Sequence, residues 1–190
     1  MLSEIVLKPL FKNTYFFISV VTVCLMIAML FSFADDSLVY SSLNSHQIWR
    51  LVSAHVVHTD VYHLTGNLLA FALLLYLFPL SWQKQIQVFV VAVVLIDVYL
   101  IVFSIEIYAG LSGLIYAIPG ARFFQLLKQK QYKSALMIVS ILILYVFVIS
   151  PQTNEFNSSN WQPLKSAHLL GFLAGYWGVS KNNFKAIRHE

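Results

Sequence analysis

Residues 86–105 read IQVFVVAVVLIDVYLIVFSI, and this stretch decides the class of fold. It is predominantly apolar over a length that, at about 1.5 Å per residue in a helix, crosses the hydrocarbon core of a bilayer. Its one charged residue is Asp97, and a charge inside a membrane span costs roughly 2.5–3.5 kcal/mol on insertion scales. Asp97 is therefore expected to face the protein interior or to be protonated.

Further apolar runs lie on both sides of this stretch. With 59% hydrophobic and 11% charged residues, the chain carries far less charge than the roughly 25% usual in soluble domains, so lipid is its expected solvent. No linker or internal repeat interrupts it, and we interpret residues 1–190 as one domain. The fold class that we expect is an all-α membrane protein, a six-transmembrane-helix bundle. The predicted spans are about 15–33, 62–80, 86–105, 110–127, 134–150 and 165–180.

The placement of lysine and arginine gives the orientation, because cytoplasmic loops carry an excess of these residues. With the N-terminus inside, ten of the twelve basic residues fall on or near the inner face, and only Arg50 and Lys165 fall outside. Both termini are therefore predicted to be cytoplasmic, in what we expect to be a bacterial inner membrane. Because the basic residues follow this membrane pattern, the net charge of +4 does not indicate nucleic-acid binding, and no nucleic-acid partner is expected.

This orientation brings three polar residues to one depth. Spans two, four and six all run from outside to inside, and Asn67, Ser112 and His168 each lie within roughly the first turn or two of one of them. Three polar side chains at a common level just below the outer surface can form a site.

Ser112 lies in the segment Gly110-Leu111-Ser112-Gly113. Glycine on both sides leaves the hydroxyl accessible, and a helix that begins there has backbone N–H groups free to bind an anion. The alternative is that Gly113 and Ala117, four residues apart, serve only close packing between helices. The segment alone does not decide between a nucleophile and a packing surface.

His168 lies beside a ridge of small residues. Ala167, Gly171 and Gly175 recur every four residues and allow close contact with another helix. An ionisable side chain in a membrane span is a functional candidate. The alternative is a buried histidine that only makes a structural hydrogen bond.

A third group of polar residues precedes span two and enters it. His63 and Asn67 are four residues apart, so they face the same way, and both can donate hydrogen bonds to an oxyanion. Because His55 and His58 lie nearby, a zinc site is the alternative. It is disfavoured because Asp60 is the one carboxylate nearby and no HExxH motif occurs, so we predict no metal and no cofactor.

Taken together, these residues resemble the rhomboid family of intramembrane serine proteases. The shared features run from Trp49 to Gly175 in the order found in the family. They are the Trp49-Arg50 pair, the H-x-x-x-N of span two, GLSG at the head of span four, Tyr116 four residues after the serine, and A-H-x-x-G-x-x-x-G on span six. The resemblance implies substrates that are single-span membrane proteins, cut near the outer, periplasmic face of the lipid bilayer.

The resemblance also implies roles for the site residues. Ser112 is the implied nucleophile and His168 the implied general base. Asn67, His63 and the backbone N–H of Ser112 would hold the oxyanion, and Tyr116 would pack against the imidazole. The other supporting residues are Gly110, Gly113, Gly171, Trp49 and Arg50, the last two in an outer loop that braces the site.

Finer points stay open in the sequence. Asp97 either makes a structural hydrogen bond or helps to orient His168. Residues 78–82 lack the glutamate-arginine-glycine pattern that many rhomboids carry after span two, and this feature together with the short chain resembles the rhombosortase branch. That branch is linked to C-terminal sorting signals of the Gly-Gly type.

Two other classes of function compete with the protease interpretation. A rhomboid-like protein that binds membrane helices without cutting them would need Ser112 or His168 to be replaced, and both are present. A small transporter predicts repeats, interrupted helices or several charges inside the membrane, whereas Asp97 stands nearly alone.

Overall fold

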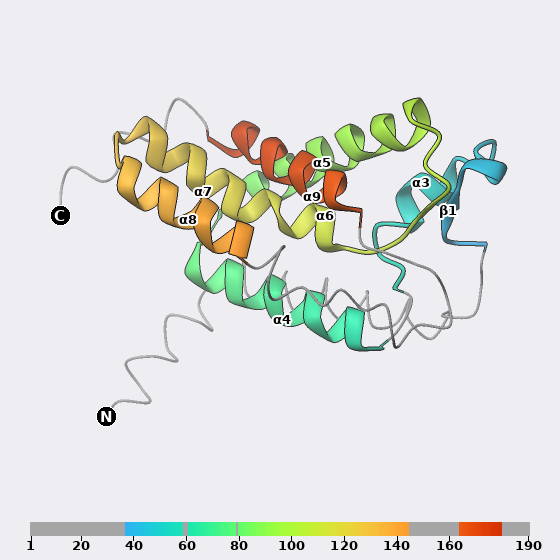
Figure 1. Ribbon diagram of the computed structural model, residues 1–190, viewed down its shortest axis with the longest axis horizontal. Helices are drawn as coiled ribbons and strands as arrows, with labels where there is room; N and C mark the ends of the chain where they lie inside the picture. The colour runs from blue at the N-terminus through green and yellow to red at the C-terminus, as the bar shows by residue number, and fades with distance from the viewer. Residues whose placement is uncertain (1–36, 59–60, 79, 145–163, 180–190) are drawn as a thin grey trace.

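The computed structural model describes residues 37–58, 61–78, 80–144 and 164–179, which form a helical bundle with one two-stranded sheet (Figure 1). The elements are β1 (Tyr40–Ser41), η1 (Ser42–Asn44), α3 (Trp49–Ser53), α4 (Val61–Leu77), α5 (Trp82–Val102), β2 (Ile107–Tyr108), α6 (Ser112–Ile115), α7 (Ala117–Lys128), α8 (Tyr132–Leu144), α9 (Lys165–Ala174) and η3 (Gly175–Gly178). The helices from α4 onward overlap the second to sixth predicted spans. The predicted span at 15–33 and both chain termini lie outside the described residues.

The long helix α5 has one buried face and one exposed apolar face. Val88, Ala92, Ile96 and Leu100 follow one another at intervals of four residues and are fully buried against the bundle. On the other face, apolar side chains such as Val94 are more than half exposed, at 53% for Val94. This pattern is typical of a helix that packs between protein and lipid.

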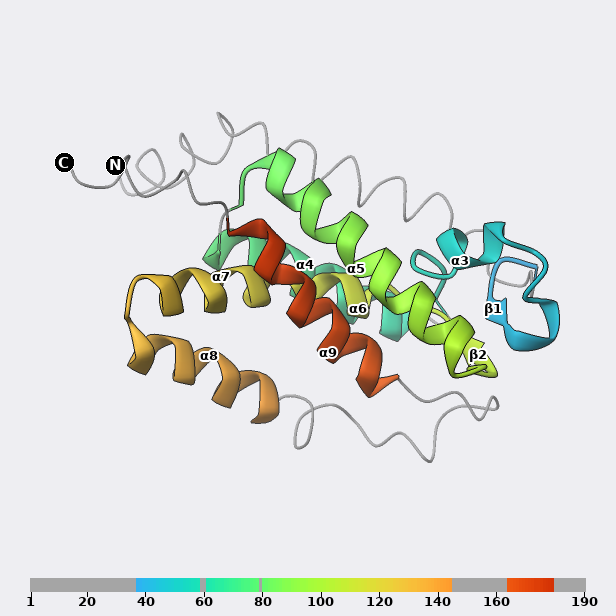
Figure 2. The same ribbon diagram turned by 90° about the horizontal axis from the view of Figure 1, so that it is seen from above.

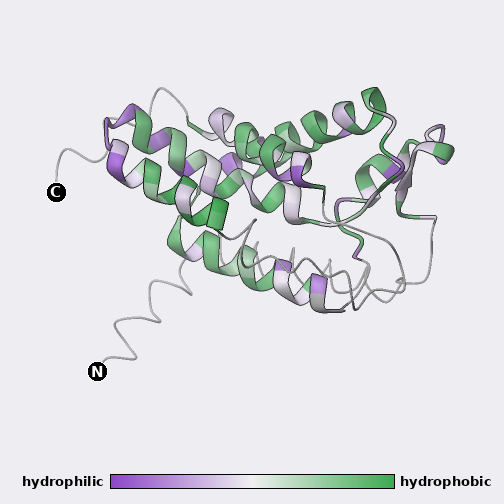
Figure 3. Cartoon of the chain, viewed as in Figure 1, coloured by the Kyte–Doolittle hydropathy of each residue, from purple (hydrophilic) through white to green (hydrophobic). Residues whose placement is uncertain are grey.

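The helices differ in how well they match the thickness of a bilayer. Within the described ranges, Gln83–Val102 is the one helix that is both long and apolar enough to cross a membrane, with a mean hydropathy of 2.4. His63–Leu77 and Tyr132–Leu144 are apolar but shorter. Figure 3 shows apolar residues over most of the helix surfaces, with hydrophilic residues near helix ends and turns.

The bounds of α5 correct the predicted position of Asp97. The prediction placed the span at 86–105 with Asp97 near its middle, but α5 ends at Val102 and the chain turns at Ser104, which has a φ of 49°. Asp97 therefore lies five residues, about 7–8 Å along the axis, from the end of the helix that leads to β2. Its carboxylate is close enough to that end to reach polar groups of the loops.

Helix α9 packs against α5, α6 and α7 (Figure 2). This packing is close because glycines remove side chains from the contact. A Cβ on Gly171 would fall on the carbonyl oxygen of Gly113, and a Cβ on Gly175 would fall on the backbone nitrogen of Ala121. The small-residue ridge predicted on the sixth span is therefore in backbone contact with the fourth.

The fourth predicted span consists of two helices, α6 and α7, which meet at Tyr116. Pro119 has no N–H to donate to the carbonyl of Ile115, four residues earlier, so the helical hydrogen-bond ladder is interrupted there. Ser112 is the first residue of the short helix α6, and its N–H precedes the first intrahelical bond.

The small sheet joins two loops that are distant in sequence. Tyr40 of β1 pairs with Tyr108 of β2 in an antiparallel register. Residues 109–111, which we call the serine loop, connect β2 to α6. The N–H of Gly110 in this loop donates to the carbonyl oxygen of Ala54 at 2.8 Å. The segment that precedes α4 therefore holds the backbone that leads to Ser112.

Candidate active site

Ser112 and His168 come from different helices and meet at hydrogen-bond distance. Ser112 begins α6 and His168 lies in the first half of α9, and their side chains place His168 Nε2 2.9 Å from Ser112 Oγ. An imidazole with a bare Nε2 accepts the hydroxyl hydrogen in this geometry. The pair therefore has the arrangement that a serine nucleophile and its general base require.

The ring of Tyr116 lies flat against the imidazole of His168. The ring centroids are 4.5 Å apart and the planes are inclined by 7°. His168 Nδ1 is buried and has no hydrogen-bond partner among the described residues. Among the described residues, the stacked tyrosine rather than a third polar side chain therefore holds the plane of the imidazole, and Asp97 does not contact Nδ1 of His168.

Asn67 of α4 is hydrogen-bonded to His58. Asn67 Nδ2 lies 2.8 Å from His58 Nε2, and His58 Nδ1 lies 3.0 Å from the carbonyl oxygen of Val56. Because a carbonyl only accepts, Nδ1 of His58 carries the hydrogen and its Nε2 accepts one N–H of the Asn67 amide. The amide has a second N–H, and the bond to His58 fixes its direction.

His63 lies between this pair and the serine loop. Its ring meets that of His58 edge-on, with centroids 4.9 Å apart. A Cβ on Gly110 would lie 2.9 Å from His63 Cε1 and 3.2 Å from its Nε2. Gly110 also has a φ of 119°, which other residues rarely adopt. Glycine at this position thus lets the imidazole of His63 approach the backbone next to Ser112.

Trp49 and Arg50 hold the segment that leads into β1. The buried Arg50 donates from Nη1 to the carbonyl oxygen of Val39 at 2.7 Å and from Nε to Gln47 Oε1 at 2.6 Å. The exposed Trp49 donates from Nε1 to the carbonyl oxygen of Ser37 at 3.3 Å. These contacts fix the backbone that enters β1, and β1 in turn pairs with β2 beside the serine loop.

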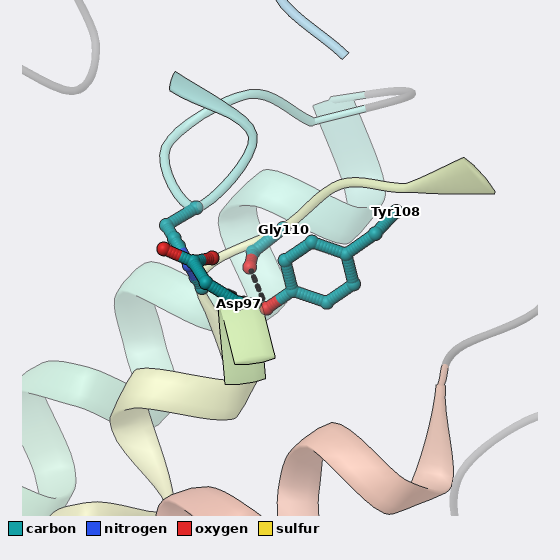
Figure 4. Close-up of polar contacts among 4 residues, drawn as sticks. Asp97, Tyr108 and Gly110 are labelled. Carbon is teal, nitrogen blue, oxygen red and sulfur yellow. Dashed lines mark hydrogen bonds and ion pairs between the residues drawn. The ribbon is translucent and has the colours of Figure 1, made fainter. Parts of the chain in front are cut away.

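Asp97, His55 and Tyr108 form a chain of polar contacts beneath the serine loop. His55 Nε2 lies 3.0 Å from Asp97 Oδ1, and His55 Nδ1 lies 3.2 Å from the hydroxyl of Tyr108. That hydroxyl donates to the carbonyl oxygen of Gly110 at 3.1 Å (Figure 4). Of the two roles considered for Asp97, the structure shows the hydrogen bond, with His55 as its partner.

The histidines that suggested a zinc site have other partners. Both ring nitrogens of His55 are engaged, by Asp97 and Tyr108. Both ring nitrogens of His58 are engaged as well, by Val56 and Asn67. A zinc ligand needs a ring nitrogen free to coordinate, so this arrangement does not fit a zinc site.

The comparison with protein families agrees with this arrangement. The family model of the rhomboid domain matches residues 45–180, a range that contains both Ser112 and His168. The chain belongs to the rhomboid family. Rhomboids are integral membrane proteins and intramembrane serine proteases that act on membrane proteins within the bilayer, although the family includes inactive members. No curated protein and no solved structure gives a significant match to this rhomboid chain.

Three polar residues of this rhomboid site had no predicted role: the sequence offers His55 and His58 only as metal ligands and gives Tyr108 none. The contact of His58 with Asn67 joins residues 9 positions apart, and the contact of Tyr108 with His55 joins residues 53 positions apart. No helical or strand spacing relates such pairs, so sequence periodicity carries no signal for them.

Gly171→Ala is expected to impair both folding and activity, because the new methyl group would fall on the carbonyl oxygen of Gly113. Overpacking of this kind costs about 1–3 kcal/mol in the free energy of unfolding. A displacement of His168 by about 1 Å is expected to slow cleavage by roughly 100-fold. Thermal unfolding in detergent and initial cleavage rates measure the two effects.

Gly66→Ala is the matched control for this substitution. Gly66 is also a helical glycine, and a Cβ on it would meet nothing within 4 Å. This variant is expected to be as stable as the wild type or more stable, because alanine has the higher helix propensity. A Gly171→Ala protein as stable and as active as Gly66→Ala would show that α9 does not approach α6 as closely as described.

Proposed function

We propose that this protein is a serine endopeptidase that cuts membrane-anchored proteins with a Ser112–His168 dyad. The observation that carries the proposal is the 2.9 Å distance between His168 Nε2 and Ser112 Oγ. Membership of a family of intramembrane proteases supports it, because that family supplies the reaction class. The stacking of Tyr116 on the imidazole supports the assignment of His168 as the base.

The proposed reaction proceeds in two steps. His168 Nε2 takes the hydroxyl hydrogen of Ser112 while Oγ attacks the carbonyl carbon of the scissile peptide bond, and a tetrahedral oxyanion forms. The protonated imidazole then gives its hydrogen to the leaving amine, and the peptide C–N bond breaks to leave an acyl-enzyme. A water molecule, deprotonated by His168, attacks this ester and releases the new carboxyl end, which regenerates Ser112.

Three donors are proposed for the oxyanion: the side chains of Asn67 and His63 and the N–H of Ser112. The bond from Asn67 to His58 directs the asparagine amide and leaves its second N–H for the substrate. The contact of His63 with the Gly110 position brings that imidazole to the backbone next to Ser112. The N–H of Ser112 lies in the first turn of α6, where helical N–H groups have no intrahelical acceptor.

We further propose that both termini are cytoplasmic, that six spans cross a bacterial inner membrane, and that the dyad lies near the periplasmic face. The distribution of lysine and arginine supports this orientation. Ser112 and His168 lie near the starts of α6 and α9, so both are close to the same end of the bundle. In the proposed orientation that end faces the periplasm.

The proposed substrates are single-span membrane proteins. A peptide bond inside a helix is shielded by the helical hydrogen bonds, so the substrate must unwind before Ser112 attacks it. Small residues, glycine above all, lower the helix propensity and the steric barrier at the cut. We propose a cut beside a small-residue pair at the outer end of the substrate span. For the rhombosortase branch, this pair is the Gly-Gly motif of a C-terminal sorting tail.

Mapping of the cut site tests the proposal. Cells that express the protein or its Ser112→Ala variant, each with a tagged single-span protein that has Gly-Gly before its span, are compared by mass spectrometry of the released product. We expect release only with the wild type, and a new C-terminus at the outer end of the span. A cut at the cytoplasmic end would contradict the orientation, and a cut at the outer end away from glycine would contradict only the sorting-tail substrate.

A further inference from the structure

The polar chain beneath the serine loop, formed by Asp97, His55 and Tyr108, belongs neither to the dyad nor to the oxyanion donors. We propose that Asp97, His55 and Tyr108 are positioning residues, a relay that holds the carbonyl of Gly110 and so the serine loop. We propose also that all hydrogen bonds of the relay form only in one protonation state of the Asp97–His55 pair. In that state the pair carries one hydrogen more than a carboxylate beside a neutral imidazole would carry. This inference rests on the proposed protease function and adds a requirement to it.

The number of hydrogens in the relay leads to this requirement. The hydroxyl of Tyr108 has one hydrogen and two neighbours, the Gly110 carbonyl oxygen at 3.1 Å and His55 Nδ1 at 3.2 Å. Since the carbonyl only accepts, the hydroxyl hydrogen belongs to that bond, and the contact with His55 needs a hydrogen on Nδ1. Burial and the charge of Asp97 both raise the pKa of Tyr108, so its hydroxyl keeps its hydrogen.

The contact between His55 Nε2 and Asp97 Oδ1, at 3.0 Å, needs a second hydrogen, on either the imidazole or the carboxyl group. The pair therefore exists as imidazolium with carboxylate or as imidazole with carboxylic acid. Neither form has a net charge, which suits side chains that are 2% exposed for His55 and 16% exposed for Asp97. All three contacts of the relay are satisfied together only in these two forms.

Loss of one hydrogen from the pair would break the relay at a defined place. The remaining hydrogen of His55 faces the Asp97 carboxylate on Nε2, and Nδ1 becomes an acceptor. The hydroxyl of Tyr108 can then donate to Nδ1 or to Gly110 but not to both. The Gly110 carbonyl therefore loses its donor for part of the time.

The Gly110 carbonyl is a sensitive point for the site. It belongs to the same peptide group as the N–H of Leu111, one residue before Ser112, and the Gly110 backbone has the unusual φ of 119°. The same Tyr108 hydroxyl also lies 3.0 Å from the position of a Cβ on Gly113. The Tyr108 hydroxyl thus lies beside Gly110 and Gly113, which precede and follow Ser112 in the chain.

The other titratable groups on neighbouring elements have separate positions or partners. Tyr40 of β1 has a pKa that burial and Asp97 both raise, so it stays neutral. His168 of α9 is bonded to Ser112, and His63 of α4 contacts Gly110 from outside the relay. Lys128 of α7 lies near Lys84 at the opposite end of α5. None of these groups belongs to the relay, so a substitution of Asp97 tests the relay itself.

Asp97→Asn is the substitution that tests the hydrogen requirement. An asparagine amide can donate an N–H to His55 Nε2, and in that orientation the histidine hydrogen lies on Nδ1 and the relay is complete without an ionisable carboxyl group. Asp97→Leu gives His55 no such donor. We expect Asp97→Asn to retain more activity than Asp97→Leu.

Tyr108→Phe tests the bond to Gly110 directly. It is expected to lower kcat by about 3- to 10-fold with little change in KM, as expected for the loss of one buried hydrogen bond. Tyr40→Phe is the matched control, because Tyr40 is equally buried, pairs with Tyr108 across the sheet and donates instead to Leu100. It is expected to keep the wild-type kcat.

The outcomes separate the relay from the protease function. Cleavage that persists in Ser112→Ala would overturn the protease function, whereas Ser112-dependent cleavage at equal rates in Tyr108→Phe and Tyr40→Phe would overturn the relay alone. An Asp97→Leu protein that is as active as Asp97→Asn would overturn the hydrogen requirement.

The protonation of His55 can also be measured without any substrate. In protein labelled with ¹⁵N-histidine, the Nδ1 signal of His55, assigned with a His55→Gln variant, is expected to show a bound hydrogen at neutral pH in both wild type and Asp97→Asn. A bare Nδ1 in the wild type would overturn the relay whether or not the protein cleaves anything.

Discussion

Ser112→Ala and His168→Ala are each expected to lower the cleavage rate by about 10⁴-fold or more while the protein stays folded. Without its hydroxyl the site has no nucleophile, and without the imidazole nothing takes the hydroxyl hydrogen at 2.9 Å. The double variant is expected to be no slower than either single one, because the two residues act as a unit. Rates are measured with a purified tagged substrate in detergent or liposomes.

Ser166→Ala is the control for the dyad variants. Ser166 lies two residues before His168 on α9, and its buried Oγ has no hydrogen-bond partner among the described residues. This variant is expected to cleave at the wild-type rate. Labelling of Ser112 by a fluorophosphonate is expected to disappear in both dyad variants but not in Ser166→Ala. Cleavage by His168→Ala near the wild-type rate would show that another group is the base.

Asn67→Ala and His63→Ala are expected to have the next largest effects, because each removes a proposed oxyanion donor. Loss of one such donor typically slows turnover by about 10²–10³-fold. The effect is expected in kcat more than in KM, since the oxyanion exists only after attack on the substrate. The N–H of Ser112 remains in both variants, so residual cleavage above the Ser112→Ala background is expected.

Two further histidine variants test the geometry of the oxyanion donors. His58→Ala removes the acceptor that directs the Asn67 amide, so it is expected to lower kcat by less than Asn67→Ala does. His46→Ala is the control, because His46 is an exposed histidine of the segment between η1 and α3. If Asn67→Ala and His46→Ala both cleaved at the wild-type rate, α4 would not supply the oxyanion donor.

The sequence predicted most of the helices because hydropathy responds to the solvent around each segment. Its errors fall where hydropathy does not change at a helix end. The run Ile101-Val102-Phe103 stays apolar although α5 ends within it, so the predicted span extended to residue 105, past the end of the helix at Val102. The break between α6 and α7 at Tyr116 was missed for the same reason, since the backbone effect of Pro119 does not alter hydropathy.

For the candidate site too, the sequence predicted one part, and the other part depends on the tertiary structure. Ser112, His168, Asn67 and His63 could be selected from the sequence because each lies in a local motif and because the predicted spans share a predicted orientation. The contact between Ser112 and His168 does not follow from these motifs. Its 2.9 Å distance depends on how closely α9 approaches α6. A glycine spacing predicts that an approach is possible but does not identify the partner helix.

By itself, the sequence determined that this protein is a helical rhomboid with a serine and a histidine at the heads of two spans. Both facts depend on local quantities, the apolarity of each run and the spacing within each motif. Only the tertiary structure decided the partners of His58, His55, Tyr108 and Asp97, which join a loop, a strand and two helices. Such contacts follow from the packing of elements distant in the chain, and a buried polar group bonds to whichever partner that packing brings within reach.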